Sequence, residues 1–157
     1  MPTVTQRDGE FQLGFAAADR DNPAPPSVDI ALDSAVTWQL RLAGGADTAS
    51  LDLRGTSVSE LDLASGVSTV EAWLPAPHNT LVVRETGGVN QLTVHVPTGA
   101  PVRLTVGGGA GSVSIDGTGH NGVSAGEQFT SGSWGSAPDR LDIDTVGGVS
   151  RVRIDPY

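Results

Sequence analysis

The chain has 157 residues, a formal net charge of −9, 21 glycines, 10 prolines and no cysteine. The lack of cysteine excludes disulfide bonds, thiolate metal sites and a cysteine nucleophile. The acidic balance argues against nucleic acid and anionic membranes as partners, because both attract basic surfaces.

No apolar run approaches the ~20 residues that a membrane span needs, and the first residues lack the apolar core of a secretion signal. We therefore expect either a cytoplasmic protein or a domain cut from a longer one.

Residues 1–27 differ from the rest and are predicted to form an N-terminal strand or cap followed by a loose segment. The strand is indicated by three alternating apolar residues, Phe11, Leu13 and Phe15. The stretch 16–26 is rich in Ala and Pro, which favours an irregular connection. Residues 28–157 are predicted to form one repetitive domain.

Two-residue corners recur through this domain, in most cases about every 21 residues, and such self-similarity is typical of stacked repeats. The last interval is close to two ordinary ones. The second residue of each corner is a glycine, which reaches positive φ without a steric clash. These predicted structural corners are Gly45, Gly66, Gly88, Gly109 and Gly148.

Apolar columns flank the corners. The residues four and six positions after each glycine are apolar and those between them polar, which indicates a strand with one buried face. They are Ala49 and Leu51, Val70 and Ala72, Leu92 and Val94, Val113 and Ile115, and Val152 and Ile154. A further column lies five positions upstream, at Leu40, Leu61, Val83, Leu104 and Ile143.

The pattern predicts an all-β fold: a parallel β-solenoid of the β-helix type, with coils of about 21 residues. Leu51, Ala72, Val94 and Ile115 should then lie over one another. The alternative is a β-sandwich of hairpins, which also gives short alternating strands at regular spacing.

Two places depart from the pattern. Glu85 occupies a weaker inward column, and we expect its carboxylate to turn into solvent at the corner, because a buried carboxylate needs donors. The stretch 117–139 interrupts the repeat. It is interpreted as one coil with an eroded pattern, or as a loop that carries a binding element.

The search for chemistry gives no catalytic set, metal site or cofactor site. His78, His95 and His120 lack metal-site spacing. The predicted ligand-binding residues are two aromatic side chains and two outward carboxylates, namely Trp134, Trp73, Asp142 and Asp144. The competing interpretations are packing for Trp134 and ordinary acidic surface for the carboxylates.

The repeat resembles a known group of domains. The segments 38–53, 61–75, 81–97 and 102–116, with the tail from Phe129 to Ser150, are similar to extracytoplasmic domains of actinobacterial membrane proteins. More distantly they resemble the toast-rack and adhesin-like solenoids. The resemblance implies a domain that follows a membrane anchor and serves envelope sensing or interaction, with no catalytic residues.

The expected function is therefore a non-enzymatic extracytoplasmic β-solenoid module for cell-envelope interaction, sensing or scaffolding. Its partners would be a protein, an envelope glycan or a second copy that joins at exposed edges or solenoid ends. The alternatives are a carbohydrate-binding module or glycan-active enzyme, and a purely structural spacer.

Overall fold

A computed structural model describes residues 2–15 and 29–157 of the chain. They belong to two units, Met1–Leu32 and Asp33–Tyr157, and each is described by itself. The regular secondary structure of the described residues consists of β-strands alone. The predicted loose segment at 16–26 lies outside these residues.

The first unit contains an antiparallel hairpin of β1 (Pro2–Arg7) and β2 (Glu10–Phe15), with Arg7 opposite Glu10. Asp8 and Gly9 form its turn with φ values of 49° and 85°. Two consecutive positive φ values are the mark of a type I′ turn, whose twist suits a hairpin.

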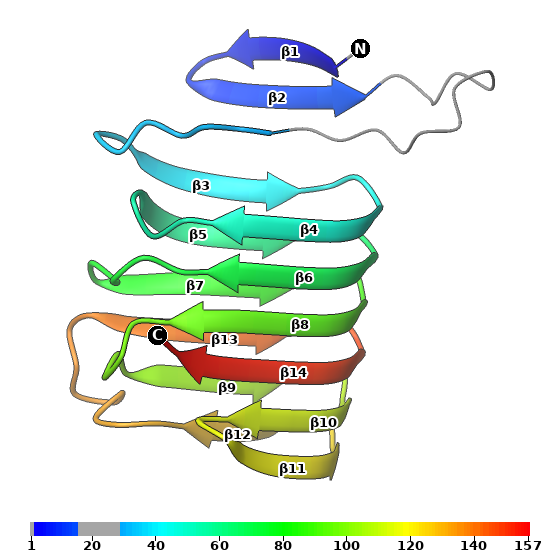
Figure 1. Ribbon diagram of the computed structural model, residues 1–157, viewed down its shortest axis with the longest axis vertical. Coiled ribbons are helices and arrows are strands. Elements are labelled where there is room, and N and C mark those ends of the chain that lie inside the picture. Colours follow the sequence, from blue (N-terminus) through cyan, green and yellow to red (C-terminus); the bar gives the residue numbers. More distant parts are fainter. Residues whose placement is uncertain (1, 16–28) are drawn as a thin grey trace. The chain divides into compact units, whose positions relative to one another are not determined.

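The second unit consists of two six-stranded sheets (Figure 1). The first, here called the front sheet, has the order β11-β10-β14-β8-β6-β4, and the second, the back sheet, has the order β12-β9-β13-β7-β5-β3. The strands are β3 (Thr37–Leu42), β4 (Ala46–Asp52), β5 (Ser57–Leu63), β6 (Val67–Trp73), β7 (Thr80–Glu85), β8 (Val89–Val96), β9 (Val102–Val106), β10 (Ala110–Ile115), β11 (Thr118–Val123), β12 (Glu127–Thr130), β13 (Arg140–Thr145) and β14 (Val149–Pro156).

Most neighbouring strands in both sheets pair in parallel. Leu51 lies beside Ala72, and Ala72 beside Val94, as the solenoid hypothesis requires. From β3 to β10, consecutive strands alternate between the sheets and do not pair with each other, whereas a sandwich of hairpins needs such pairs. The all-β prediction is confirmed, and the two mixed sheets are consistent with a solenoid.

The coils do not follow chain order. β13 lies between β7 and β9, and β14 lies between β8 and β10, so the last coil of the chain stands inside the stack. Ile154 therefore separates Val94 from Ile115 in the apolar column.

The interpretation of 117–139 as one coil with an eroded pattern holds only in part, because the stretch gives one strand to each sheet but both strands run antiparallel to their neighbours. Asp116 and Gly117, at φ 49° and 79°, turn the chain back, so that β11 pairs antiparallel with β10 and β12 antiparallel with β9. These two strands close one end of each sheet. The connection 131–139 then leads back to β13.

The apolar columns form a common interior between the sheets. Leu61, Val83, Ile143 and Leu104 are at most 1% exposed, as are Val70, Leu92, Val152 and Val113. Full burial of such a side chain contributes roughly 1.5–3 kcal/mol. One inward column was missed: the residue directly after the corner glycine, which is buried at Val67, Val89, Ala110 and Val149 and exposed only at Ala46, on the edge strand β4.

The expectation for Glu85 is wrong, because its side chain is fully buried. Its carboxylate accepts a hydrogen bond from the backbone N–H of Gly88. Its backbone carbonyl accepts hydrogen bonds from the N–H groups of Val146 and Gly147, in the corner between β13 and β14. The Gly88 amide thus provides one donor to the carboxylate, whereas the Oε2 atom is buried without a hydrogen-bond partner among the described residues. Burial raises the pKa of Glu85, while the N–H groups of Gly88, Gly87 and Gly147 counteract that rise.

Candidate functional site

Two outward clusters of side chains contain three of the four predicted ligand residues, and Asp144 lies beside the second cluster. The first, the Trp73 cluster, lies on the front sheet and comprises Asp52, Arg54, Glu71, Trp73, His95 and Tyr157. Parallel pairing places Asp52 beside Trp73, and Trp73 beside His95, in one outward row. The same register that stacks the core therefore also stacks these polar and aromatic groups.

Trp73 and His95 form a planar stack, with ring centroids 4.6 Å apart and an interplanar angle of 15°. His95 Nε2 lies 3.1 Å from the Glu71 carboxylate. Both rings are half-buried and stand on strands of the stack, so their orientation is fixed before any ligand arrives.

Arg54 crosses the end of this row. Its Nε and Nη2 atoms donate to the two carboxylate oxygens of Asp52 at 2.8 and 2.6 Å. Its guanidinium carbon lies 5.9 Å from the centre of the Trp73 ring and 6.0 Å from that of Tyr157. The hydrogen bonds from Arg54 lower the pKa of Asp52 to about 2, so this carboxylate is ionised at neutral pH.

Tyr157 is hydrogen-bonded to the ends of β6 and β8. Its hydroxyl donates to the carbonyl of Leu74 at 2.8 Å, and its backbone N–H donates to Val96. Burial of the phenol raises its pKa. The Tyr157 ring therefore faces Arg54, while its hydroxyl is used in a hydrogen bond that stabilises the fold.

The second group, the Trp134 cluster, lies on the back sheet and comprises Arg103, Trp134, Arg140 and Asp142. The guanidinium carbons of Arg103 and Arg140 lie 3.7 and 4.4 Å from the Trp134 ring centre. Arg103 also donates to both oxygens of Asp142, at 3.0 and 2.5 Å. Two cations thus contact one indole.

Trp134 is also fixed through its ring nitrogen, which donates to the carbonyl of Leu141 at 2.8 Å. This bond and the two arginines hold the connection 131–139 against β13. Asp144 stands in the next outward position of β13, opposite Arg84 and Thr105. Trp134 and the two aspartates therefore belong to the back sheet, whereas Trp73 belongs to the front sheet.

Sequence reasoning missed the arginines and Tyr157, which complete both clusters. Arg103 and Asp142 are adjacent only because β13 is inserted beside β9. Linear spacing carries no signal for that contact. The stack of His95 on Trp73 follows from the register between β6 and β8, which linear spacing does not give.

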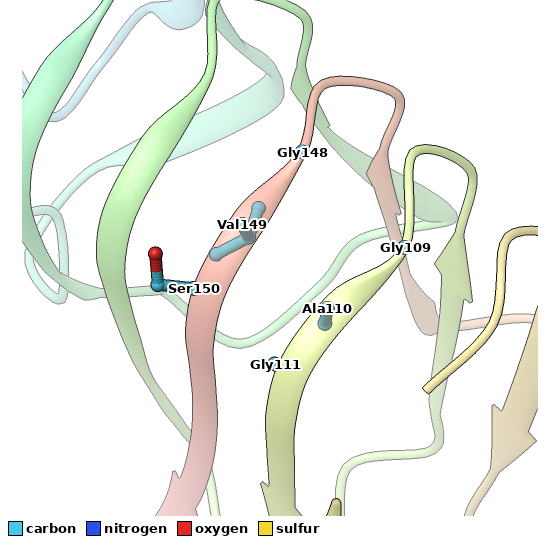
Figure 2. Close-up of a pocket in the computed structure, with 6 residues that line it drawn as sticks. All are labelled: Gly109, Ala110, Gly111, Gly148, Val149 and Ser150. Atoms are coloured by element: carbon cyan, nitrogen blue, oxygen red, sulfur yellow. The ribbon is translucent and has the colours of Figure 1, made fainter. Parts of the chain in front are cut away.

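A shallow depression of about 340 Å³ lies on the outer surface where β10 and β14 leave their corners (Figure 2). It is lined by residues 109–111 and 148–150, so the only polar side chain in its lining is that of Ser150. A Cβ on Gly111 would lie 2.7 Å from the carbonyl oxygen of Ser150. Close strand approach therefore explains this glycine.

No group of three His, Asp or Glu side chains suited to a metal ion occurs among residues 2–15 and 29–157. Within the same residues, no helix is long and apolar enough to cross a membrane.

Residues 3–95, which end inside β8, match the family model described as the N-terminal domain of toast_rack, DUF2154. The chain belongs to the toast_rack family. The resemblance noted in the sequence is thereby confirmed at the level of the family.

A solved structure shares the fold of this chain. The crystal structure of a "putative cell adhesion protein" from Clostridium sporogenes aligns with 100% of this chain and 76% of its own, with a TM-score of 0.69 and 19% identity. At this identity the likeness shows a common fold alone. No curated protein matches the chain significantly.

Proposed function

We propose that this toast-rack chain is a non-enzymatic module on the extracytoplasmic side of a membrane-anchored parent protein, where it binds a component of the cell envelope. We further propose that the domain is a solenoid in which each repeat of about 21 residues forms one coil. The family match and the fold of the cell adhesion protein support it.

The observation that carries the proposal is the construction of the outward faces. In both clusters, a half-buried tryptophan on or beside the stacked strands is held by its neighbours: Trp73 stacks on His95, and Arg103 contacts the Trp134 ring. These contacts give fixed binding surfaces without assembling a nucleophile and base. A rigid surface of this kind suits recognition of an extended partner.

The location is tested in cells that carry the full-length parent protein. A protease site inserted after Gly9, in the β1–β2 turn, should be cleaved when protease is added to intact cells. A cytoplasmic marker with the same site is the control. Cleavage only after lysis would contradict the extracytoplasmic assignment.

A second candidate function, carbohydrate binding, is favoured by the Trp73 cluster. The edges of the stacked Trp73 and His95 rings, with Asp52 and Glu71 beside them, offer a sugar both an apolar contact and hydrogen-bond partners. The Asp142 and Asp144 carboxylates belong to the same proposal as contacts on the back sheet, together with Trp134.

Glycan binding is tested on an array of envelope polysaccharides, followed by titration of any hit. Trp73→Ala should weaken binding at least about ten-fold, equal to 1.4 kcal/mol. Phe11→Ala, which removes another outward aromatic, should leave binding unchanged. A blank array rejects binding of the sugars tested, and release of reducing ends from a polysaccharide would instead support the glycan-active enzyme.

Self-association through sheet edges is a third element of the proposal. β4 and β3 stand at the ends of the strand orders of the front and back sheets. Edge strands present backbone donors and acceptors to another chain. Light scattering over a concentration series tests this, and a constant monomer mass would reject it.

A further inference from the structure

The last coil, residues 140–156, is here called the inserted coil, and it completes both sheets of the stack. β13 pairs with β7 on one side and β9 on the other, while β14 pairs with β8 and β10 (Figure 1). β7 does not pair with β9, nor β8 with β10. Without the inserted coil, the fold would contain a slot bordered by four strands.

The inserted coil is held by the apolar interior. Leu141, Ile143 and Val152 are fully buried, and Val149 and Ile154 are at most 4% exposed. An empty slot would lose the stabilisation that these side chains provide, because the burial of each contributes roughly 1.5–3 kcal/mol. A stable molecule needs this segment, or an identical one, in the slot.

Polar contacts make the slot selective for this segment. Arg103 of β9 forms a two-bond ion pair with Asp142 of β13. On the other side, the backbone carbonyl of Glu85 accepts from Val146 and Gly147 at the inserted corner. Both borders thus recognise the inserted coil through groups at defined positions.

The connection 131–139 is long for the gap that it crosses. Thr130 ends β12 opposite Arg103, and Leu141 lies opposite Val102, so both ends of the connection flank the start of β9. That gap is two strand spacings, about 10 Å. Once the contacts of Trp134 with Arg103 and Leu141 are released, the connection could extend to about 30 Å, which is long enough for the coil to enter another molecule.

We propose that the slot accepts the inserted coil of a second copy of this chain, and that the protein self-associates by reciprocal exchange of residues 140–156. An exchanged dimer contains the same ladders, burial and ion pairs as two monomers and differs only in the path of 131–139. This proposal concerns the slot and does not rest on the envelope function or on the sheet edges.

Exchange competes with insertion within one chain. A short tether gives its own segment an effective concentration on the order of millimolar. Dilute chains therefore remain monomeric, and exchange becomes important where copies are crowded or refold together at high concentration.

The test uses engineered cysteines in the full-length chain, which has none of its own. Arg153 in β14 lies directly beside Thr93 in β8. Chains with Thr93→Cys alone and chains with Arg153→Cys alone are unfolded, mixed, refolded and oxidised. Only exchange brings the two cysteines into this position, within the range that a disulfide can span.

The fraction of chains in the disulfide-linked heterodimer should rise roughly in proportion to the protein concentration during refolding, about 100-fold between 5 and 500 µM. It should exceed by at least ten-fold the product from Thr93→Cys mixed with Asp47→Cys, which exchange does not place together. A yield equal to this control at every concentration would overturn the proposal. The pair Thr105→Cys and Asp144→Cys, adjacent in the back sheet, repeats the test if the first variants do not fold.

Discussion

At the scale of single residues, glycine has two different roles in the corners. Gly88 and Gly109 have positive φ values of 77° and 83°, as the sequence argument expected, but the expectation is wrong for Gly45, Gly66 and Gly148, which do not have positive φ. Elsewhere the requirement is space: a Cβ on Gly108 would lie 2.6 Å from Gly147, and one on Gly147 would lie 2.7 Å from the amide nitrogen of Gly88. Corners of neighbouring coils therefore approach each other too closely for a side chain.

Gly147→Ala should lower the free energy of unfolding by about 1–3 kcal/mol, because backbone atoms cannot move cheaply away from the new methyl group. Gly44→Ala, at a first corner residue with open space around it, should change stability by less than about 0.5 kcal/mol. Urea denaturation of the two variants measures both values. Equal losses would show that close approach is not the reason for glycine at 147.

Glu85 makes stability depend on pH. Its pKa in the folded state is raised above the ordinary 4.5, first by burial and also by the nearby Asp144 carboxylate. The folded state therefore binds the proton more tightly than the unfolded state, and the contribution of Glu85 to the free energy of unfolding falls as pH rises from about 4.5 through the folded pKa. Above that pKa its contribution is constant.

Glu85→Gln removes this titration. The free energy of unfolding of the variant minus that of the wild type should rise with pH in that window and then level off. Urea denaturation of both proteins from pH 4.5 to 8 checks the difference. Parallel profiles would mean that Glu85 does not titrate differently on folding.

At the scale of elements, the strands resemble one another in their register and inward residues but differ in their outward residues. Ala46 pairs with Val67, and Val67 with Val89, so successive corners align. Inward positions carry similar Leu, Ile, Val and Ala side chains. Outward positions carry the particular contacts, such as Arg103 with Asp142, that distinguish one coil from another.

Deletion of residues 45–65 tests the coil as an element. It joins Gly44 to Gly66, removes β4 and β5, and keeps every remaining inward residue in phase. We expect a folded protein of lower stability with an unchanged circular dichroism spectrum per residue, because stacked repeats lose one interface per coil removed.

Deletion of 45–55 is the control, because it breaks the phase of the columns. It should unfold the protein or leave it aggregated. If both deletions behaved alike, the repeat of about 21 residues would not be the structural unit.

At the scale of the whole molecule, the chain reverses direction and then returns into its own stack. β11 and β12 end the two sheets, and the inserted coil then pairs with strands that precede it by about 40 and 60 residues. Such distant pairing costs loop-closure entropy before its contacts form, so insertion belongs late in folding. The open slot that precedes it is the physical basis of the exchange proposed above.

The all-β fold, the corners and most inward columns could be predicted from the sequence, because alternation and corner spacing are local consequences of strand geometry. The sequence also predicted outward positions for Asp142 and Asp144. Coil order, the burial of Glu85 and the partners of Trp134 were decided only by the tertiary structure. Inward residues are nearly equivalent in every coil, so the pattern cannot tell which coils are neighbours. That choice depends on a turn at Asp116 and Gly117 and on contacts between residues far apart in the chain.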